Sequence, residues 1–154
     1  VGAYIDGYHG DNAYTYVAGE VSDEAKKLLE ATEQSLREAI KVAVAGNRLG
    51  DIGFAVQSYV EARGFSVIRE YVGHGVGRDL HEDPEVPNYG KAGHGMRLVP
   101  GMTIAIEPMV AAGKSAVKRL SDQWTVVTAD HSLAAHFENT ILITQGEPVI
   151  LTKA

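Results

Sequence analysis

The spacing of apolar residues is strand-like at the start of the chain, helical in the next part, and strand-like again toward the end. Residues 1–17 are rich in β-branched and aromatic residues, and Asp6-Gly7 separates two such runs, Val1–Ile5 and Tyr8–Val17. An Asp-Gly pair between strand-like runs is typical of the tight turn of a β-hairpin. The sequence therefore predicts a hairpin at the start of the chain.

Two helices are predicted after the hairpin. Apolar residues of the first recur at the spacing of one helical face, at Leu28, Leu29, Leu36 and Ile40. Ser22 or Asp23 can cap its first turn, and Gly46 can end it. The second helix is predicted to be capped by Asp51 and stopped by Gly64.

The remainder of the chain is predicted to be rich in strands. Phe65–Tyr71 has the pattern of a strand, the glycine-rich Gly73–Pro87 that of an ordered loop, and Asn88–Gly101 that of an exposed excursion. The further predicted strands are Met102–Ile106, Ala116–Leu120, Trp124–Thr128, Ala134–Thr144 and Val149–Thr152. A hairpin, two helices and an antiparallel sheet predict an α+β fold, with residues 1–154 as a single domain.

Composition and charge fit a globular domain and exclude several classes of site. Apolar residues make up 45% of the chain and charged residues 22%, close to the averages for globular proteins. The net charge is −6 and the basic residues are scattered, so we expect no direct recognition of nucleic acid. Because there is no cysteine, disulfides, thiolate metal sites and thiol nucleophiles are excluded, which agrees with a reducing cytoplasm. No apolar run approaches the roughly 20 residues of a membrane span, so we expect no membrane association.

Two histidines and three carboxylates occupy unusual places in this pattern. His74 lies between glycines at the end of a predicted strand, and His81 follows seven residues later in the predicted loop. Glu107 ends a very apolar strand and is followed by a proline, where a charge is costly unless it is paired or bound to a metal. Asp11 and Glu138 also lie in strand-like runs among aromatic and small residues.

Each of these residues has an ordinary explanation when it is taken alone. Gly73–Gly77 loosely resembles a phosphate-binding loop, but such a loop needs a following helix, which the acidic, proline-containing Asp79–Pro87 does not favour. His74 alone is compatible with a solvated loop histidine, and Glu107 alone with an ion-paired strand end. Taken together, one imidazole and three strand-borne carboxylates form a nitrogen and oxygen ligand set for a divalent metal.

Several longer motifs carry a specific resemblance over almost the whole chain. Their order and spacing are similar to those of type I methionine aminopeptidases. The motifs are Asp6–Asp11, Tyr71–Pro84, Pro100–Val110, Trp124–Thr128 and Ala135–Thr140. The resemblance implies the pita-bread fold of that family, in which two α/β halves related by a pseudo-two-fold axis enclose a site for two metal ions.

The resemblance also implies a role for each candidate residue. Asp11 and Glu138 resemble the carboxylates that bridge both metals, and His74 and Glu107 resemble the remaining ligands of one of them. Glu107 would also act as the general base on the shared water. His81 resembles the histidine that contacts the substrate amide and stabilises the developing charge.

The expected activity follows from this resemblance. It is removal of the N-terminal methionine from nascent proteins, by hydrolysis with a water activated at two divalent ions. Co, Mn, Fe(II) and Zn suit the ligand set about equally well. Trp124 resembles a wall of the methionine pocket. The expected substrates are N-terminal Met-peptides of nascent chains, and the ribosome is a candidate partner of a monomeric, cytoplasmic enzyme.

The chain departs from the family pattern at its start. The family places its first metal ligand, an aspartate, eleven residues before the position of Asp11, which falls immediately before Val1. We therefore expect an N-terminally truncated, incomplete pita-bread fold that holds at most one ion firmly, on the His74 side. Whether this chain is active or inactive by itself stays open. Asp6 belongs to the predicted hairpin turn and is not expected to replace the missing ligand.

Smaller departures concern single side chains. Asn139 stands where the family often has histidine, and Leu80 where an aromatic pocket residue is common. His94 lies in the predicted excursion and is interpreted as a surface residue. Two alternatives remain beside the methionine aminopeptidase: a related pita-bread peptidase that cleaves Xaa-Pro bonds, and a pita-bread binding module without catalysis.

Overall fold

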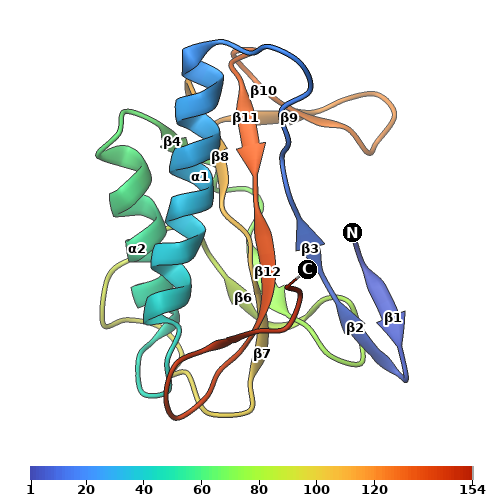
Figure 1. The fold of residues 1–154 in the computed structure, drawn as a ribbon, viewed down its shortest axis with the longest axis vertical. Helices are drawn as coiled ribbons and strands as arrows, with labels where there is room; N and C mark the ends of the chain where they lie inside the picture. The colour runs from blue at the N-terminus through green and yellow to red at the C-terminus, as the bar shows by residue number, and fades with distance from the viewer. Residues whose placement is uncertain (154) are drawn as a thin grey trace.

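The computed structural model describes residues 1–153, and in it two helices cover one side of a set of antiparallel strands (Figure 1). Helix α1 (Asp23–Val42) and helix α2 (Leu49–Glu61) pack against each other. The chain enters through a hairpin, β1 (Ala3–Ile5) and β2 (Tyr8–Gly10), which projects on the opposite side of the strands. The predicted α+β class is confirmed.

Helix α1 has the cap and the buried face that the sequence predicts. Ser22 is the N-cap, and its Oγ accepts a hydrogen bond of 3.2 Å from the amide of Ala25. Asp23 and Glu24 lie in the first turn, where negative charge is favourable at the positive end of the helix dipole. The buried face consists of Leu28, Ala31, Thr32, Ser35, Leu36, Ala39 and Ile40.

Helix α2 begins earlier than predicted, and part of the segment 88–101 packs on its start. Asp51 is not the cap but the third helical residue, and its carboxylate accepts a hydrogen bond of 2.7 Å from the amide of Arg48. Residues 88–101 were expected to form an exposed excursion, but Asn88 and Leu98 are buried. The carbonyl of Tyr89 comes so close to Gly53 that a Cβ there would lie 2.3 Å from it.

The largest sheet has six antiparallel strands. Its order is β13 (Val149–Ile150), β12 (Glu138–Leu142), β7 (Thr103–Ile106), β5 (Gly73–Gly75) and β6 (Glu82–Val86), and β3 (Asn12–Ala13) also pairs with β12. Residues 73–87 were expected to be a loop, but they form the β5–β6 pair with a register shift between Gly73 and Gly75. Both glycines are required by close packing, because a Cβ would lie 2.3 Å from the Ala105 carbonyl at Gly73 and 2.2 Å from the Asp83 carbonyl at Gly75.

The remaining strands form smaller sheets. One contains β11 (Ala134–His136), β8 (Met109–Ala111) and β4 (Ser66–Val67) in that order, and the other pairs β9 (Val117–Arg119) with β10 (Val126–Thr128). The sequence did not predict β8, and the predicted strands at 8–17 and 65–71 are shorter in the structure.

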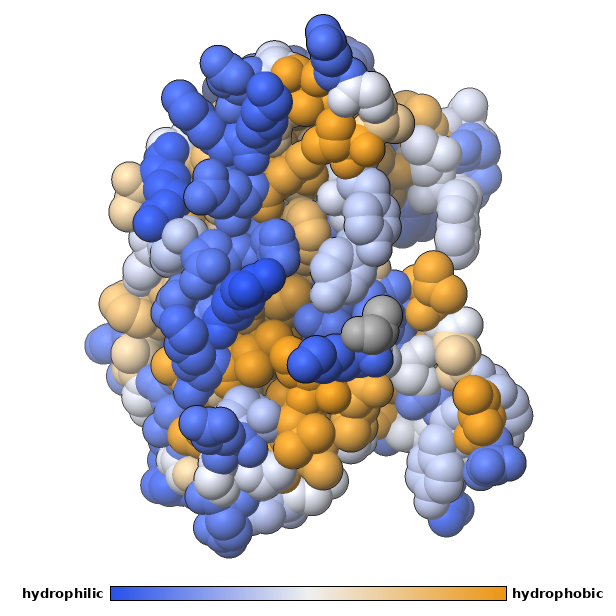
Figure 2. Space-filling model, in the orientation of Figure 1, coloured by the Kyte–Doolittle hydropathy of each residue, from blue (hydrophilic) through white to orange (hydrophobic). Residues whose placement is uncertain are grey.

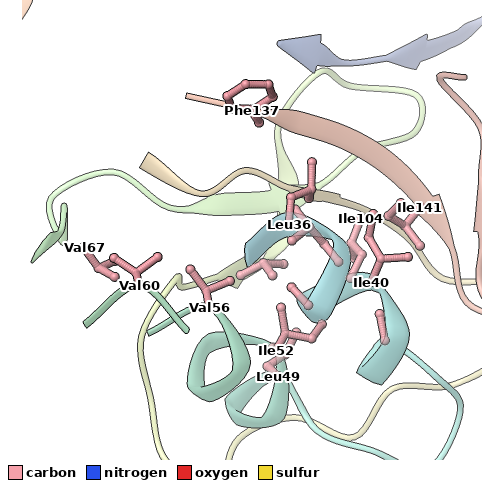
Figure 3. Packing of buried hydrophobic residues seen from close by; sticks show 14 of the residues in the cluster. Leu36, Ile40, Leu49, Ile52, Val56, Val60, Val67, Ile104, Phe137 and Ile141 are labelled. Carbon is pink, nitrogen blue, oxygen red and sulfur yellow. The ribbon is translucent and has the colours of Figure 1, made fainter. Parts of the chain in front are cut away.

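The hydrophobic core lies between the helices and the strands (Figure 3). Leu36 and Ile40 from α1, Ile52 and Val56 from α2, and Ile104 and Ile141 from the sheet belong to one buried cluster. Hydrophilic side chains cover the outer side of the helices, whereas separate apolar groups are exposed on the projecting hairpin (Figure 2). Within residues 1–153, no helix is both long and apolar enough to cross a membrane.

Candidate metal centre

Five side chains that the sequence singled out meet where β3, β5, β7 and β12 approach one another. His74, Glu107 and Glu138 offer ligand atoms that all lie within 4.8 Å of one another, and so do Asp11, His74 and His81. The two groups share His74 and form a continuous cluster. The segments that supply them are neighbours because β12 pairs with both β3 and β7, and β7 pairs with β5.

Glu107 lies directly after β7. Its carboxylate faces His74, and its main-chain carbonyl is held by a hydrogen bond. Its Oε1 is 3.6 Å from Nε2 of His74. The Nδ2 of Asn88 donates a hydrogen bond of 2.8 Å to the Glu107 carbonyl oxygen. The side-chain amide of Asn88 therefore holds the main chain at Glu107, directly after the apolar strand ends.

The geometry at His74 favours a free nitrogen that points into the cluster. Its Nδ1 lies 2.8 Å from the carbonyl oxygen of Gly75, which is satisfied when Nδ1 carries the proton and donates it. In this tautomer Nε2 has a lone pair and faces Glu107 across 3.6 Å. Metal-bound histidines commonly donate their other ring N–H to a backbone carbonyl in this way.

Glu138 is a buried carboxylate among other carboxylates. Burial in the protein raises the pKa of Glu138 to about 8, and the nearby charges of Glu107 and Asp11 add to the shift. Its Oε1 has no hydrogen-bond partner in the described part of the chain. A buried acceptor that stays unpaired costs free energy, about 1–3 kcal/mol or more for a charged group, so this oxygen favours a cation or a proton.

Asp11 is held against β12, the strand that carries Glu138, by the hydroxyl of Thr140. Thr140 Oγ1 accepts a hydrogen bond of 2.9 Å from the Asp11 amide and donates one of 2.9 Å to the Asp11 carbonyl oxygen. The Asp11 carboxylate is partly buried and accepts one from the amide of Asn12. The imidazole of His81 stacks at a tilt on that of His74, with 4.2 Å between the ring centres, and His81 is exposed to solvent.

These residues fit divalent metal ions by their chemistry. One imidazole nitrogen and several carboxylate oxygens converge, and the buried Oε1 of Glu138 is unpaired within residues 1–153. The distance of 3.6 Å between His74 and Glu107 agrees with two ligands that each lie about 2.0–2.2 Å from one ion. The fit covers the two bridging candidates, Asp11 and Glu138, as well as His74 and Glu107.

Two residues near this cluster were not singled out from the sequence. One is Asn88, for which the sequence holds no signal, since its partner is a backbone carbonyl nineteen positions away. The other is His136, whose Nε2 lies 3.2 Å from Oε2 of Glu107. His136 precedes Glu138 by two positions, and residues two apart in an extended chain face the same side, so this spacing was a usable signal.

Trp124 lies apart from the cluster. It belongs to the turn between β9 and β10, and 88% of its surface is exposed. It does not line any of the cavities described for residues 1–153, so its place in a substrate pocket stays a prediction.

Three other residues weighed from the sequence have ordinary surroundings. Asp6 is in the β1–β2 turn with a positive φ of 52°, and it belongs to neither ligand group. His94 is exposed, as interpreted from the sequence, and its Nδ1 contacts the carbonyl of Ala92. Asn139 is buried and donates to Thr152 Oγ1 over 3.2 Å.

Comparisons with a family model and with individual proteins agree on one family. The sequence pattern of metallopeptidase family M24 matches residues 1–145. Methionine aminopeptidase 1 of Bacillus subtilis is 58% identical over 153 residues, which are 99% of this chain and 62% of that protein. The chain thus spans about three fifths of the length of this relative.

Solved structures agree with the sequence comparison. The crystal structure of a methionine aminopeptidase from Thermotoga maritima superimposes with a TM-score of 0.98 at 53% identity, covering 99% of this chain and 61% of the other. A more distant structure, the prolidase from Pyrococcus horikoshii, has a TM-score of 0.77 at 25% identity and covers 99% of this chain and 38% of the other.

Proposed function

The chain belongs to metallopeptidase family M24 and has the α+β pita-bread fold of that family, and we propose that it carries catalytic machinery for removing the N-terminal methionine of peptides. The single observation that carries the proposal is the convergence of Asp11, His74, Glu107 and Glu138 on one cluster. The high identity to methionine aminopeptidases supports the choice of reaction.

The proposed ligands divide into two pairs. In a full-length active site, Asp11 and Glu138 would help to hold two divalent ions, and His74 and Glu107 would complete the shell of one of them. Divalent ions held there would supply a water of lowered pKa and would polarise the scissile carbonyl. Glu107 would take the proton of that water as general base, and its position between His74 and His136 supports this task.

His81 would act on the substrate and not on the metal. Its ring touches that of His74, and it is exposed, so a peptide can reach it. An imidazole N–H at this place can donate to the oxygen or nitrogen of the scissile amide as charge develops there. Donors of this kind contribute about 10²–10³-fold to turnover in other hydrolases.

The apolar side chain of the substrate has a candidate site beside Glu107. A cavity of about 320 Å³ is lined by Tyr71, Met109, Val117, Val126 and His136, among others. His136 links the cavity to the metal centre, because its Nε2 contacts Glu107. An unbranched apolar side chain such as that of methionine suits such a lining better than a charged one.

The finer parts of the proposal concern the metal, the substrates and the setting. Mn, Co, Fe(II) and Zn all suit a ligand set of imidazole and carboxylates. We propose nascent proteins with an N-terminal methionine as substrates, the cytoplasm as the place of action, and a monomer as the acting form.

A substrate panel tests the proposed function. The purified protein is incubated with Mn²⁺ or Co²⁺ and with Met-Ala peptides, and matched Leu-Ala peptides and Xaa-Pro dipeptides serve as comparisons. We expect metal-dependent release of methionine that a chelator abolishes. Preferential cleavage of Xaa-Pro would favour the related peptidase, and metal binding without any hydrolysis would favour a binding module.

A further inference from the structure

The carboxylate of Glu107 has a different neighbour on each of its two oxygens. Oε1 faces Nε2 of His74 at 3.6 Å, and Oε2 faces Nε2 of His136 at 3.2 Å. His74 belongs to a group of converging ligand atoms, whereas His136 belongs to neither such group. The two histidines therefore have different relations to the carboxylate between them.

The ring of His136 has a buried nitrogen that faces this carboxylate. Its Nε2 has no aligned hydrogen-bond partner among residues 1–153, and the oxygen of Glu107 is 3.2 Å away. A lone pair on Nε2 would repel the carboxylate oxygen, so this nitrogen is favoured as the one that carries a proton. A small rotation of the ring or of the carboxylate would align the N–H with Oε2.

The main chain of His136 is fixed on both sides of this contact. Thr15 Oγ1 accepts a hydrogen bond of 3.0 Å from the His136 amide and donates one of 2.8 Å to the His136 carbonyl. On the other edge, His136 pairs with Met109 in the β11–β8 ladder. The next residue, Phe137, is buried in the core. The imidazole is thus presented to Glu107 from a rigid backbone.

We propose that His136 is a positioning residue for Glu107. Its Nε2–H donates to Oε2, which fixes the rotation of the carboxylate and leaves Oε1 directed to the centre beside His74. The assignment rests on the proposed function, since it gives His136 a task at the same site. Carboxylates that bind metals are commonly held by such an outer hydrogen bond, and losing it typically costs about 10–100-fold in metal affinity or activity.

Three substitutions at position 136 test whether a side-chain N–H that reaches Oε2 of Glu107 is required. The glutamine side chain of the variant His136→Gln can place an amide N–H near the position of Nε2, whereas the asparagine of His136→Asn is too short, and His136→Ala has no donor. His131→Ala is the matched control, because His131 is an exposed histidine whose ring contacts Lys118 and not the cluster.

The main measurement is Mn²⁺ affinity by calorimetry on the purified protein, with thermal unfolding in the absence of metal as a check of folding. We expect His136→Ala and His136→Asn to lose about 10–100-fold in affinity, and His136→Gln to keep most of it. His131→Ala should bind like the wild type. Unfolding temperatures of the Asn and Gln variants should be similar.

Three results would overturn the proposal. Unchanged affinity in all variants would show that the contact has no influence on Glu107. Equal loss in the Asn and Gln variants would show that reach to Oε2 is not the property that matters. If the wild type binds no metal at all, the proposed function fails as well, whereas normal wild-type binding with unaffected variants overturns the role of His136 alone.

Discussion

Glu138 and Asp130 are two carboxylates near the ends of strands, yet their surroundings are opposite. Asp130 lies in an exposed turn and accepts hydrogen bonds from the Lys114 amide at 2.7 Å, the Ser132 amide at 3.1 Å and the Ser132 hydroxyl at 2.7 Å. These donors lower the pKa of Asp130 to about 2. Burial and neighbouring carboxylates raise the pKa of Glu138 to about 8.

The contrast separates a carboxylate that completes a turn from one that we propose as a metal ligand. Local N–H and O–H donors stabilise the negative charge of Asp130. The loop packs so closely that a Cβ on Gly113 would lie 2.3 Å from Oδ2 of Asp130. Glu138 has an oxygen without a hydrogen-bond partner among residues 1–153 and lies near Asp11 and Glu107. The number of hydrogen-bond donors around each acid therefore differs in the direction that the proposed roles require.

The largest expected effect is loss of metal binding on substitution inside the cluster. Glu107→Ala should lower Mn²⁺ affinity by more than the roughly 10–100-fold typical of an outer-shell change, because the substitution removes a proposed direct ligand. Asp130→Ala, which removes an acid of the turn, should leave the affinity unchanged. Calorimetric titration of both variants measures this difference. Equal losses would mean that the contrast between the two acids has no functional meaning.

A second comparison tests whether His81 acts on the substrate, as proposed, or binds the metal. His81→Ala should reduce turnover of Met-peptides by about 10²–10³-fold, the usual effect of removing a donor to the developing charge. Its metal content should remain near that of the wild type, whereas Glu107→Ala should lose both. Metal analysis beside a peptide-release assay gives the two quantities. Metal loss in His81→Ala as large as in Glu107→Ala would make His81 a ligand.

The raised pKa of Glu138 predicts pH-dependent metal binding. Between pH 6 and 8 the metal-free protein holds a proton on Glu138 that a bound ion must displace, so affinity should rise with pH, by up to about tenfold per unit for one proton. Above pH 8 the rise from this group should stop. Calorimetry in buffers of different ionisation enthalpy counts the proton released. A slope that persists in Glu138→Gln would assign the proton to another group.

The smallest expected effect is on the stability of the metal-free protein. The pKa of Glu138 is about 8 in the folded state, above its unfolded value, so its favourable contribution is complete below about pH 4.5 and is lost as pH rises through 8. Glu138→Gln should therefore gain stability relative to the wild type between pH 5 and 8. A gain of 1 kcal/mol corresponds to about 2–4 °C in unfolding temperature for a chain of this size.

Asp130 provides the counterpart with the opposite sign. Its folded pKa is depressed to about 2, so its contribution is present above its unfolded pKa and lost as pH falls toward 2. Asp130→Asn should lower the unfolding temperature at neutral pH but flatten its decline below pH 4. Scans of both variants across pH 3–8 would show two opposite slopes. Parallel behaviour of the two variants would contradict the assignment.

Helices and much of the strand pattern could be predicted because their signals are local. Ser22 and the apolar face of α1 are visible in the sequence, and so is the Asp6-Gly7 turn of the hairpin. The β5–β6 pair was missed because glycine-rich, acidic residues have low strand propensity, and long-range pairing to β7 outweighs it. The buried position of Asn88 was hidden for a similar reason, since it depends on packing against distant segments.

By itself, the sequence determined the types of residues available for chemistry: carboxylates and imidazoles without cysteine, set in apolar strands, in motifs that resemble one family. Only the tertiary structure decided which of them meet. Strand pairing brings Asp11 and Glu138 together from opposite ends of the chain, and turns His136 toward Glu107 while Trp124 stays exposed. The physical reason is that charge and hydrogen bonding act over a few ångströms, and those distances are fixed by packing and not by order along the chain.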